Sequence, residues 1–267
     1  MPEFDPTAAT AGIKFLYHYQ KFDPEHLTTV LRDHKIYCSD PSSMNDPWDF
    51  RPWFDHGPML DNPSEMERML EYFRSNVGDE VLNSPERLLF EEQLRQNPEK
   101  LREFMETFSV RLSETICKRR IYCLTPCPVS ILMWAHYAQN HTGVCLEFSV
   151  NNQLIGAARP VKYNTDYPRW TPQTIKEEVS ALILTKAMDW RYEREFRILV
   201  GEGPNFKGTP YELDGSHVHL PPGALTSVIL GCEAKHALIE NLIRTFAPGL
   251  PIKHARRVTN KYELEII

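Results

Sequence analysis

The segment Trp190–Arg197 carries the residues best suited to chemistry in this chain. Its sequence is Trp-Arg-Tyr-Glu-Arg-Glu-Phe-Arg, and an apolar stretch follows it. Side chains alternate across a β-strand, so the pattern predicts a strand that buries Phe196 and places Glu193, Glu195 and Arg197 on the other face. Paired carboxylates can transfer protons or hold a divalent cation through oxygen. The charged face is therefore either a functional cleft or a solvated row of ion pairs.

Two further polar clusters lie near the start of the chain. In Tyr17-His18-Tyr19, a predicted strand directs His18 away from its two tyrosine neighbours. Its imidazole either bonds a backbone carbonyl or contacts a ribose hydroxyl or a phosphate. The loop Asn45-Asp46-Pro47-Trp48-Asp49 offers a carboxamide, two carboxylates and an aromatic ring. It forms either an Asx turn, in which Asn45 or Asp46 bonds its own backbone, or part of a site.

Histidines occur at two other suggestive spacings. His136 and Asn140 are four residues apart on a predicted helix, and they project from a face different from that of Trp134, which we expect in the core. His217 and His219 share one face of a predicted strand and form a possible metal pair. No third ligand for that pair is identifiable in the sequence.

Short strands alternate with helices around these clusters. Periodicity predicts strands over 14–19, 35–39, 120–125, 144–150 and 228–231 and near 161, 252 and 262–267, and helices over 24–33, 130–140, 172–186 and 235–246. In residues 64–118 the apolar residues recur at the spacing of amphipathic helices, which predicts a helical insertion. We therefore expect one α+β domain spanning residues 1–267, with a mostly antiparallel mixed sheet core and an inserted helical segment at 64–118.

Composition narrows the class of protein. The chain has 267 residues, 42% of them hydrophobic, which is enough for a sizeable core. Its net charge of −6 argues against non-specific binding of nucleic acid or anionic membranes. The sequence has no apolar run of about 20 residues and no signal peptide, and most of its cysteines lie in apolar strand-like runs. We expect a cytoplasmic protein without a structural metal.

Several common sequence signatures are missing. The sequence contains no G-x-x-x-x-G-K-[ST], no G-x-G-x-x-G after a strand, no G-x-S-x-G and no H-E-x-x-H. The chain is therefore not expected to be a Walker-type ATPase, a Rossmann dehydrogenase, an α/β-hydrolase or a zincin.

The clusters occur in an order that resembles a known bacterial family. The resemblance rests on Leu16-Tyr17-His18-Tyr19, Asn45–Asp49, Met133-Trp134-Ala-His136-Tyr137-Ala138, and Trp190–Arg197 with its upstream Lys186. It runs from about residue 14 to the C-terminus. That family is catalogued as a domain of unknown function, with relatives among abortive phage-resistance proteins. It implies a role in defence or as a toxin.

The layout is also similar to the ADP-ribosyltransferase fold. In those enzymes a first-strand His or Arg grips NAD, an aromatic ring stacks on nicotinamide, and a late-strand Glu is catalytic. Breaking the nicotinamide–ribose bond develops oxocarbenium character, which a carboxylate stabilises. The resemblance implies Glu195 as the catalytic carboxylate and Glu193 as its partner on the acceptor side. The residues expected to contact NAD are His18, Tyr19, Asn45, Asp46, Trp48, His136, Trp190 and Arg197.

Two other classes of function stay open. Asp46, Asp49, Glu193 and Glu195 could hold Mg²⁺ in a metal-dependent phosphodiesterase or nuclease. A non-catalytic module could use the same polar cleft only to recognise a ligand. For the favoured class, the partners are a small-molecule nucleotide and an unidentified acceptor macromolecule, without a membrane. We expect the charged row to face a cleft also lined by His18 or the Asn45–Asp49 loop.

Overall fold

The structure is a computed structural model that describes residues 7–51, 53–55, 57–75, 84–167, 169–170, 183–202 and 207–267. The chain divides into two compact units. Unit 1 comprises Met1–Ser43, Arg119–Tyr163 and Met188–Ile267, and unit 2 comprises Met44–Lys118 and Asn164–Ala187. Helices occur together with a mixed sheet, so the predicted α+β class is confirmed.

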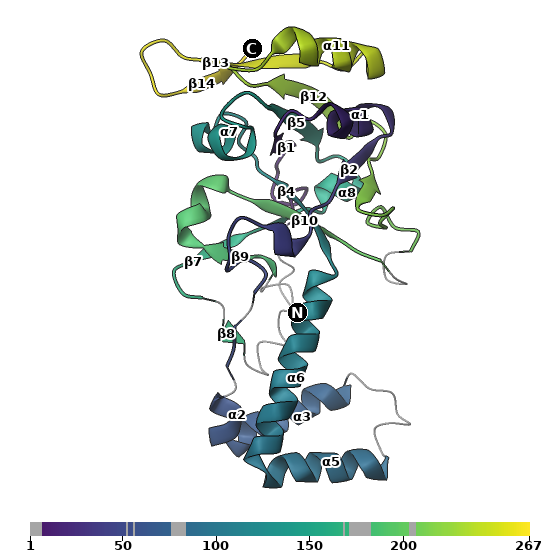
Figure 1. The fold of residues 1–267 in the computed structure, drawn as a ribbon, viewed down its shortest axis with the longest axis vertical. Coiled ribbons are helices and arrows are strands. Elements are labelled where there is room, and N and C mark those ends of the chain that lie inside the picture. Colours follow the sequence, from purple (N-terminus) through teal and green to yellow (C-terminus); the bar gives the residue numbers. More distant parts are fainter. Residues whose placement is uncertain are drawn as a thin grey trace. The chain divides into compact units, whose positions relative to one another are not determined.

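A five-stranded sheet organises unit 1, and its order is β1-β5-β12-β13-β14 (Figure 1). The central strand β5 (Val144–Ser149) pairs antiparallel with both β1 (Phe15–Gln20) and β12 (Leu225–Leu230). β13 (Ile252–Arg257) runs parallel to β12, and β14 (Leu264–Ile266) runs antiparallel to β13. The sheet is therefore mixed and mostly antiparallel, as the sequence predicts.

One face of this sheet packs against two helices. Leu146 and Phe148 of β5 join a buried cluster with apolar residues of α1 (Pro24–Arg32) and α11 (His236–Phe246). The α1 helix begins where the sequence predicts, because the Asp23 carboxylate accepts the backbone N–H groups of the first turn. Burying these apolar faces is the main source of stability in this part of unit 1.

A shorter helix packs on the opposite face of the sheet. The α7 helix (Ile131–Tyr137) buries Trp134 completely among residues of β1, β5 and β12, and the indole N–H donates to the Pro128 carbonyl at 2.9 Å. Ser130 caps its N-terminus, as predicted. The helix ends before residue 140, because residues 139–141 have φ values of 49°, 53° and 67°. Left-handed backbone cannot continue a right-handed helix.

A second sheet of unit 1, in the order β4-β10-β6, is antiparallel. It comprises β4 (Arg120–Leu124), β10 (Phe196–Val200) and β6 (Arg159–Pro160). Elsewhere in unit 1, β2 (Lys35–Tyr37) pairs with β11 (His217–His219). The remaining short elements of unit 1 are η1 (Pro41–Ser43), α8 (Gln153–Gly156) and η2 (Met188–Glu193). The strand β7 (Lys162–Asn164) ends at the first residue of the second segment of unit 2, and β9 (Thr185–Ala187) lies within that segment.

Unit 2 contains the helices predicted for residues 64–118. They are α2 (Gly57–Asp61), α3 (Pro63–Ser75), α5 (Pro85–Gln96) and α6 (Pro98–Cys117). Their shared core is rich in methionine and includes Met59, Met66, Met69 and Met105. Two short parallel strands, β3 (Trp53–Phe54) and β8 (Arg169–Trp170), connect the two segments that make up this unit.

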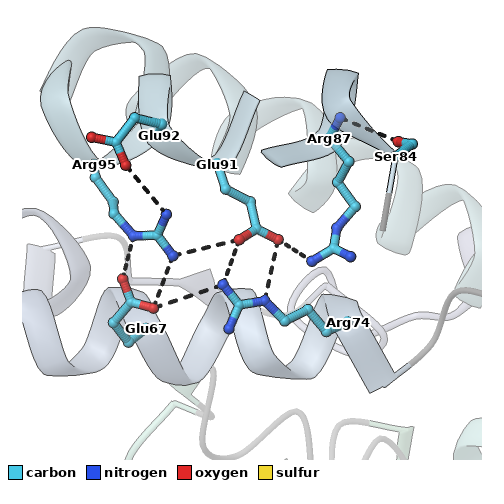
Figure 2. A network of polar contacts seen from close by, with 7 residues as sticks. All are labelled: Glu67, Arg74, Ser84, Arg87, Glu91, Glu92 and Arg95. Carbon is cyan, nitrogen blue, oxygen red and sulfur yellow. Dashed lines mark hydrogen bonds and ion pairs between the residues drawn. The ribbon is translucent and has the colours of Figure 1, made fainter. Parts of the chain in front are cut away.

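A network of arginines and glutamates fixes α5 against α3 (Figure 2). Glu91 of α5 is only 4% exposed and accepts hydrogen bonds from Arg74 of α3 and from Arg87 and Arg95 of its own helix. Arg95 also donates to Glu67 of α3. Arg74 is the largest of the causes that lower the pKa of Glu91 to about 2. A buried carboxylate held by three guanidinium groups constrains how the two helices pack.

The predicted helix over 172–186 can be compared with the structure only at its C-terminal end. Residues 171–182 lie outside the described residues. At the described end, Thr185–Ala187 form the strand β9, so the prediction of helix up to Lys186 is wrong. Thr185 is β-branched, which favours an extended backbone over the last turn of a helix.

Trp134 provides a test of the core. Replacing Trp134 by Ala should lower the free energy of unfolding by about 3–5 kcal/mol, the range for a fully buried large aromatic residue. Urea unfolding measures the change. Leu132→Ala on the same helix is the control, because Leu132 is 46% exposed and should lose far less. Equal losses in the two variants would contradict the placement of α7.

Candidate functional site

The charged row does not lie on one continuous strand. Residues 188–193 form the 3-10 helix η2, Arg194 has a φ of 48°, and β10 begins only at Phe196. The prediction of a strand through Glu193 and Glu195 is therefore wrong. A residue at positive φ interrupts the extended backbone, so strict alternation cannot run through it. Phe196 does enter the main core, as predicted.

Glu193 helps to fasten η2 to α7. Its carboxylate is 3% exposed and accepts the hydroxyl hydrogen of Tyr137. The neighbouring residues repeat the connection, because Nδ1 of His136 lies 2.9 Å from the Tyr192 hydroxyl. Trp190 completes this aromatic group, with its ring centre 6.1 Å from that of Tyr192. The two motifs found in the sequence therefore meet in the fold.

Glu195 and Arg197 form a buried ion pair. Glu195 is 5% exposed and Arg197 is 1% exposed. The guanidinium donates from Nε to one carboxylate oxygen at 2.7 Å and from Nη2 to the other at 2.9 Å. The backbone N–H of Glu195 donates to the Tyr163 hydroxyl at 2.7 Å. Because both carboxylate oxygens are engaged, the pair also anchors the second sheet of unit 1.

His18 bonds a backbone carbonyl, which is one of the two alternatives raised by the sequence. Its Nδ1 lies 2.7 Å from the carbonyl oxygen of Cys123, and its ring stacks on Tyr122 with centres 4.3 Å apart. A carbonyl oxygen can only accept, so Nδ1 carries the proton and Nε2 keeps a free lone pair. Burial lowers the pKa of His18 to about 4, despite the opposing effect of the Cys123 carbonyl. The imidazole is therefore neutral at pH 7.

Tyr19 has a structural position on the same strand. Its hydroxyl donates to the Cys127 carbonyl at 2.7 Å, and its ring meets Trp134 edge-on at 5.1 Å. Burial raises the pKa of Tyr19. Its contact with NAD stays a prediction.

In unit 2, the loop 45–49 lines a pocket of about 430 Å³. This loop and Arg51 form part of the wall, and the residues 164–167 and β9 form another part. Trp48 is 64% exposed and Tyr167 is 39% exposed, so both aromatic rings are accessible. The Tyr167 hydroxyl donates to the Trp48 carbonyl at 3.4 Å and joins the two segments. The pocket therefore depends on residues from distant parts of the sequence.

Asp46 is the unusual residue of this pocket. It is 3% exposed, and its Oδ1 accepts the backbone N–H of Trp48 at 2.9 Å, which is the predicted Asx turn. Its Oδ2 is buried and has no hydrogen-bond partner in the described part of the chain. Buried polar atoms are nearly always bonded, and a buried carboxylate oxygen without a donor is costly. Asp46 also lines the pocket, so the oxygen that lacks a donor belongs to a residue of the pocket wall.

Asp49 and Lys186 provide charges that are already balanced. Nζ of Lys186 lies 3.9 Å from Oδ2 of Asp49, and the two side chains are 5% and 1% exposed. Burial raises the pKa of the Tyr167 hydroxyl, and the nearby Asp46 adds to this effect. Tyr167 is therefore a neutral hydrogen-bonding group at pH 7.

The predicted site residues divide between the two units. His18, Tyr19, His136, Trp190, Glu193, Glu195 and Arg197 belong to unit 1, and Asn45, Asp46 and Trp48 belong to unit 2. Asp46 and Trp48 line the pocket, whereas Asn45 does not. The pocket also contains Lys186 and Tyr167, which the sequence analysis does not predict as site residues. Lys186 did carry a signal, because it begins the Lys-x-x-x-Trp motif before Trp190.

The described residues provide no cluster of metal ligands for the alternative of a metal-dependent enzyme. Among those residues, no three His, Cys, Asp or Glu side chains are grouped so that they could hold a metal ion. This includes His217 and His219 of β11. None of the described helices is both long enough and apolar enough to cross a membrane.

Comparison with known proteins identifies one family. Residues 133–198 match a family described as a protein of unknown function, DUF2971. The matched segment begins in α7 and ends in β10, so it contains the bonded pairs Tyr137–Glu193 and Glu195–Arg197. No curated protein and no solved structure was found to match the chain.

The Glu195–Arg197 pair provides a second test. Glu195→Gln leaves a buried guanidinium without its counter-charge and should lower the free energy of unfolding by about 3–5 kcal/mol. The double variant Glu195→Gln with Arg197→Met removes both charges and should recover a large part of that loss. Urea unfolding of the single and double variants measures the coupling. Strictly additive losses would show that the two side chains do not depend on each other.

The shifted pKa of His18 predicts a dependence of stability on pH. The unfolded chain binds a proton at this residue near pH 6.5, whereas the folded chain does so only near pH 4. The contribution is therefore neutral above about pH 6.5, and stability falls by up to about 3 kcal/mol as the pH drops to about 4. Unfolding free energies measured across this range should fall less steeply for His18→Gln. Parallel curves for the two proteins would contradict the assignment.

Proposed function

We propose that this chain is an NAD-using, ADP-ribosyltransferase-like enzyme that holds the nicotinamide end of NAD in the pocket of unit 2. The observation that carries the proposal is the buried Oδ2 of Asp46, which has no hydrogen-bond partner among the described residues and belongs to a residue that lines the same pocket as the exposed Trp48. A nicotinamide ring brings a flat face for the indole and an amide N–H for the carboxylate. The two groups are therefore complementary to this end of NAD.

The proposed reaction breaks the bond between the nicotinamide nitrogen and C1′ of ribose. Nicotinamide leaves with the bonding electron pair, and C1′ takes an oxygen from water or from an acceptor hydroxyl. One carboxylate stabilises the oxocarbenium character of the ribose and a second takes the proton of the attacking oxygen; the sequence resemblance implies Glu195 for the first role and Glu193 for the second. Glu195 is bonded to Arg197 through both of its oxygens, so one guanidinium contact must be released before the charge can act on a ribose.

The proposal also includes a cellular compartment and a biological role. Cys38, Cys127, Cys145 and Cys232 are free cysteines, which fits a reducing compartment such as the cytoplasm. A defence or toxin role, with an acceptor macromolecule, rests on the sequence resemblance alone.

A ligand-binding module without catalysis is the second candidate. The observation that favours it is that both proposed catalytic carboxylates are already hydrogen-bonded inside unit 1. Such carboxylates can serve the fold without any reaction. In this case NAD binds and nicotinamide is not released.

Calorimetry and nicotinamide release together test the proposal. Wild-type protein should bind NAD without a divalent cation and release nicotinamide. Asp46→Asn should weaken NAD binding by about tenfold or more, the scale of one hydrogen bond to a charged group. Compared under conditions in which circular dichroism shows both proteins to be folded, Glu195→Gln should slow release by about two to three orders of magnitude and leave the dissociation constant almost unchanged.

Three outcomes discriminate among the candidates. Absence of NAD binding by the folded wild-type protein would overturn the transferase proposal. NAD binding without release would favour the binding module. Nicotinamide release that survives Glu195→Gln would remove Glu195 from the reaction. Asp166→Asn is the matched control, because Asp166 also lines the pocket but is exposed to solvent.

A further inference from the structure

The charges of the unit 2 pocket do not cancel. Three aspartates, one arginine and one lysine line it, and Lys186 is paired with Asp49. Asp46, Asp166 and Arg51 remain, which leaves the wall with one excess negative charge. Asp166 and Arg51 are exposed, so solvent screens them, whereas Asp46 is buried. The excess negative charge that matters is therefore that of Asp46.

A buried negative charge favours a particular kind of occupant. An uncompensated buried carboxylate is strongly unfavourable, and a cation close to it removes much of that cost. The Oδ2 atom of Asp46 is buried and has no donor among the described residues, so an occupant with an N–H donor satisfies it once the side chain turns toward the pocket. A ligand that combines positive charge with an N–H donor meets both requirements.

The aromatic side chains restrict the shape of that cation. Trp48 and Tyr167 line the same pocket with 64% and 39% of their surfaces exposed. Indole is the best aromatic partner for a cation, and a flat ring buries more area against it than a compact ammonium group does. A pocket of about 430 Å³ accommodates one such ring with its substituents.

We infer that the unit 2 pocket is selective for a planar aromatic cation that carries an N–H donor, such as a pyridinium amide, and that it discriminates against the neutral ring of the same shape. The inference rests on the proposed function for the use of this pocket. It goes further by naming positive charge as the recognised property. It implies that oxidised NAD binds and that its reduced form, with an uncharged ring, binds more weakly.

A pair of small probes isolates the charge. The 1-methylnicotinamide ion, methylated on the ring nitrogen, is a planar cation, and nicotinamide is nearly the same ring without the charge. Calorimetry on the wild-type protein should give 1-methylnicotinamide at least about tenfold tighter binding, the combined scale of a cation–π contact and a charge-assisted hydrogen bond. Asp46→Asn should reduce this ratio to near one, because the amide keeps the shape but removes the charge.

Trp48 is tested by a matched pair of variants. Trp48→Ala should weaken binding of 1-methylnicotinamide by about three- to tenfold. Trp53→Ala should have no effect, because Trp53 is 52% exposed in the same unit but does not line the pocket. Circular dichroism of each variant establishes that the fold is intact before binding is compared.

Each result decides one statement. Equal affinity of the wild-type protein for the two probes, or discrimination that survives Asp46→Asn, would overturn the inference. Charge-selective binding of the probes in a protein that neither binds nor cleaves NAD would overturn the proposed function and leave this inference standing. NAD binding and cleavage by a protein with no preference for the charged ring would overturn this inference and leave the proposed function standing.

Discussion

A buried charge requires a partner, and this constraint governs the polar architecture of both units. On the central strand β5, Glu147 is 6% exposed and accepts from Lys253 at 2.7 Å and from Thr226 at 2.9 Å. The Glu195–Arg197 pair in unit 1 and the Glu91 network in unit 2 follow the same rule. Pairing of this kind makes a polar interior possible, because each ion is bonded by the next. Asp46 departs from the rule, and this departure makes its pocket a candidate site.

The same constraint explains why a suggestive sequence motif can have a structural role. Two glutamates and an arginine within five residues are typical of an active site, yet here Tyr137 and Arg197 engage both glutamates inside the fold. These contacts connect η2 to α7 and support the second sheet. The pocket of unit 2 instead combines an exposed indole, a buried carboxylate and a paired lysine. The candidate for ligand binding is therefore the loop around Asp46.

Much of the fold could be predicted from local patterns. Strands such as Val144–Ser149 alternate clearly, and α1 has both a capping aspartate and a proline in its first turn. The sequence predicts that the strand starts before Phe196, where it actually begins, and the reason for this error is local. Arg194 has a positive φ, a conformation that usually requires glycine, and nothing in the sequence indicates it. Half of the pocket could be predicted, because Asp46 and Trp48 stand in one conspicuous loop. Tyr167 and Lys186 could not, because only the tertiary fold brings them to that loop.

The division of the chain also limits how the pocket can be inherited. Unit 2 consists of two separate segments, 44–118 and 164–187, and each is flanked by parts of unit 1. Asp46 comes from the first segment and Lys186 from the second, so any contiguous stretch of the gene that encodes the pocket also encodes residues 119–163 of unit 1. Joining segments so far apart costs chain entropy, which other contacts of the fold must offset. A recombination event that transfers the pocket as one piece must therefore carry a middle segment of unit 1 with it.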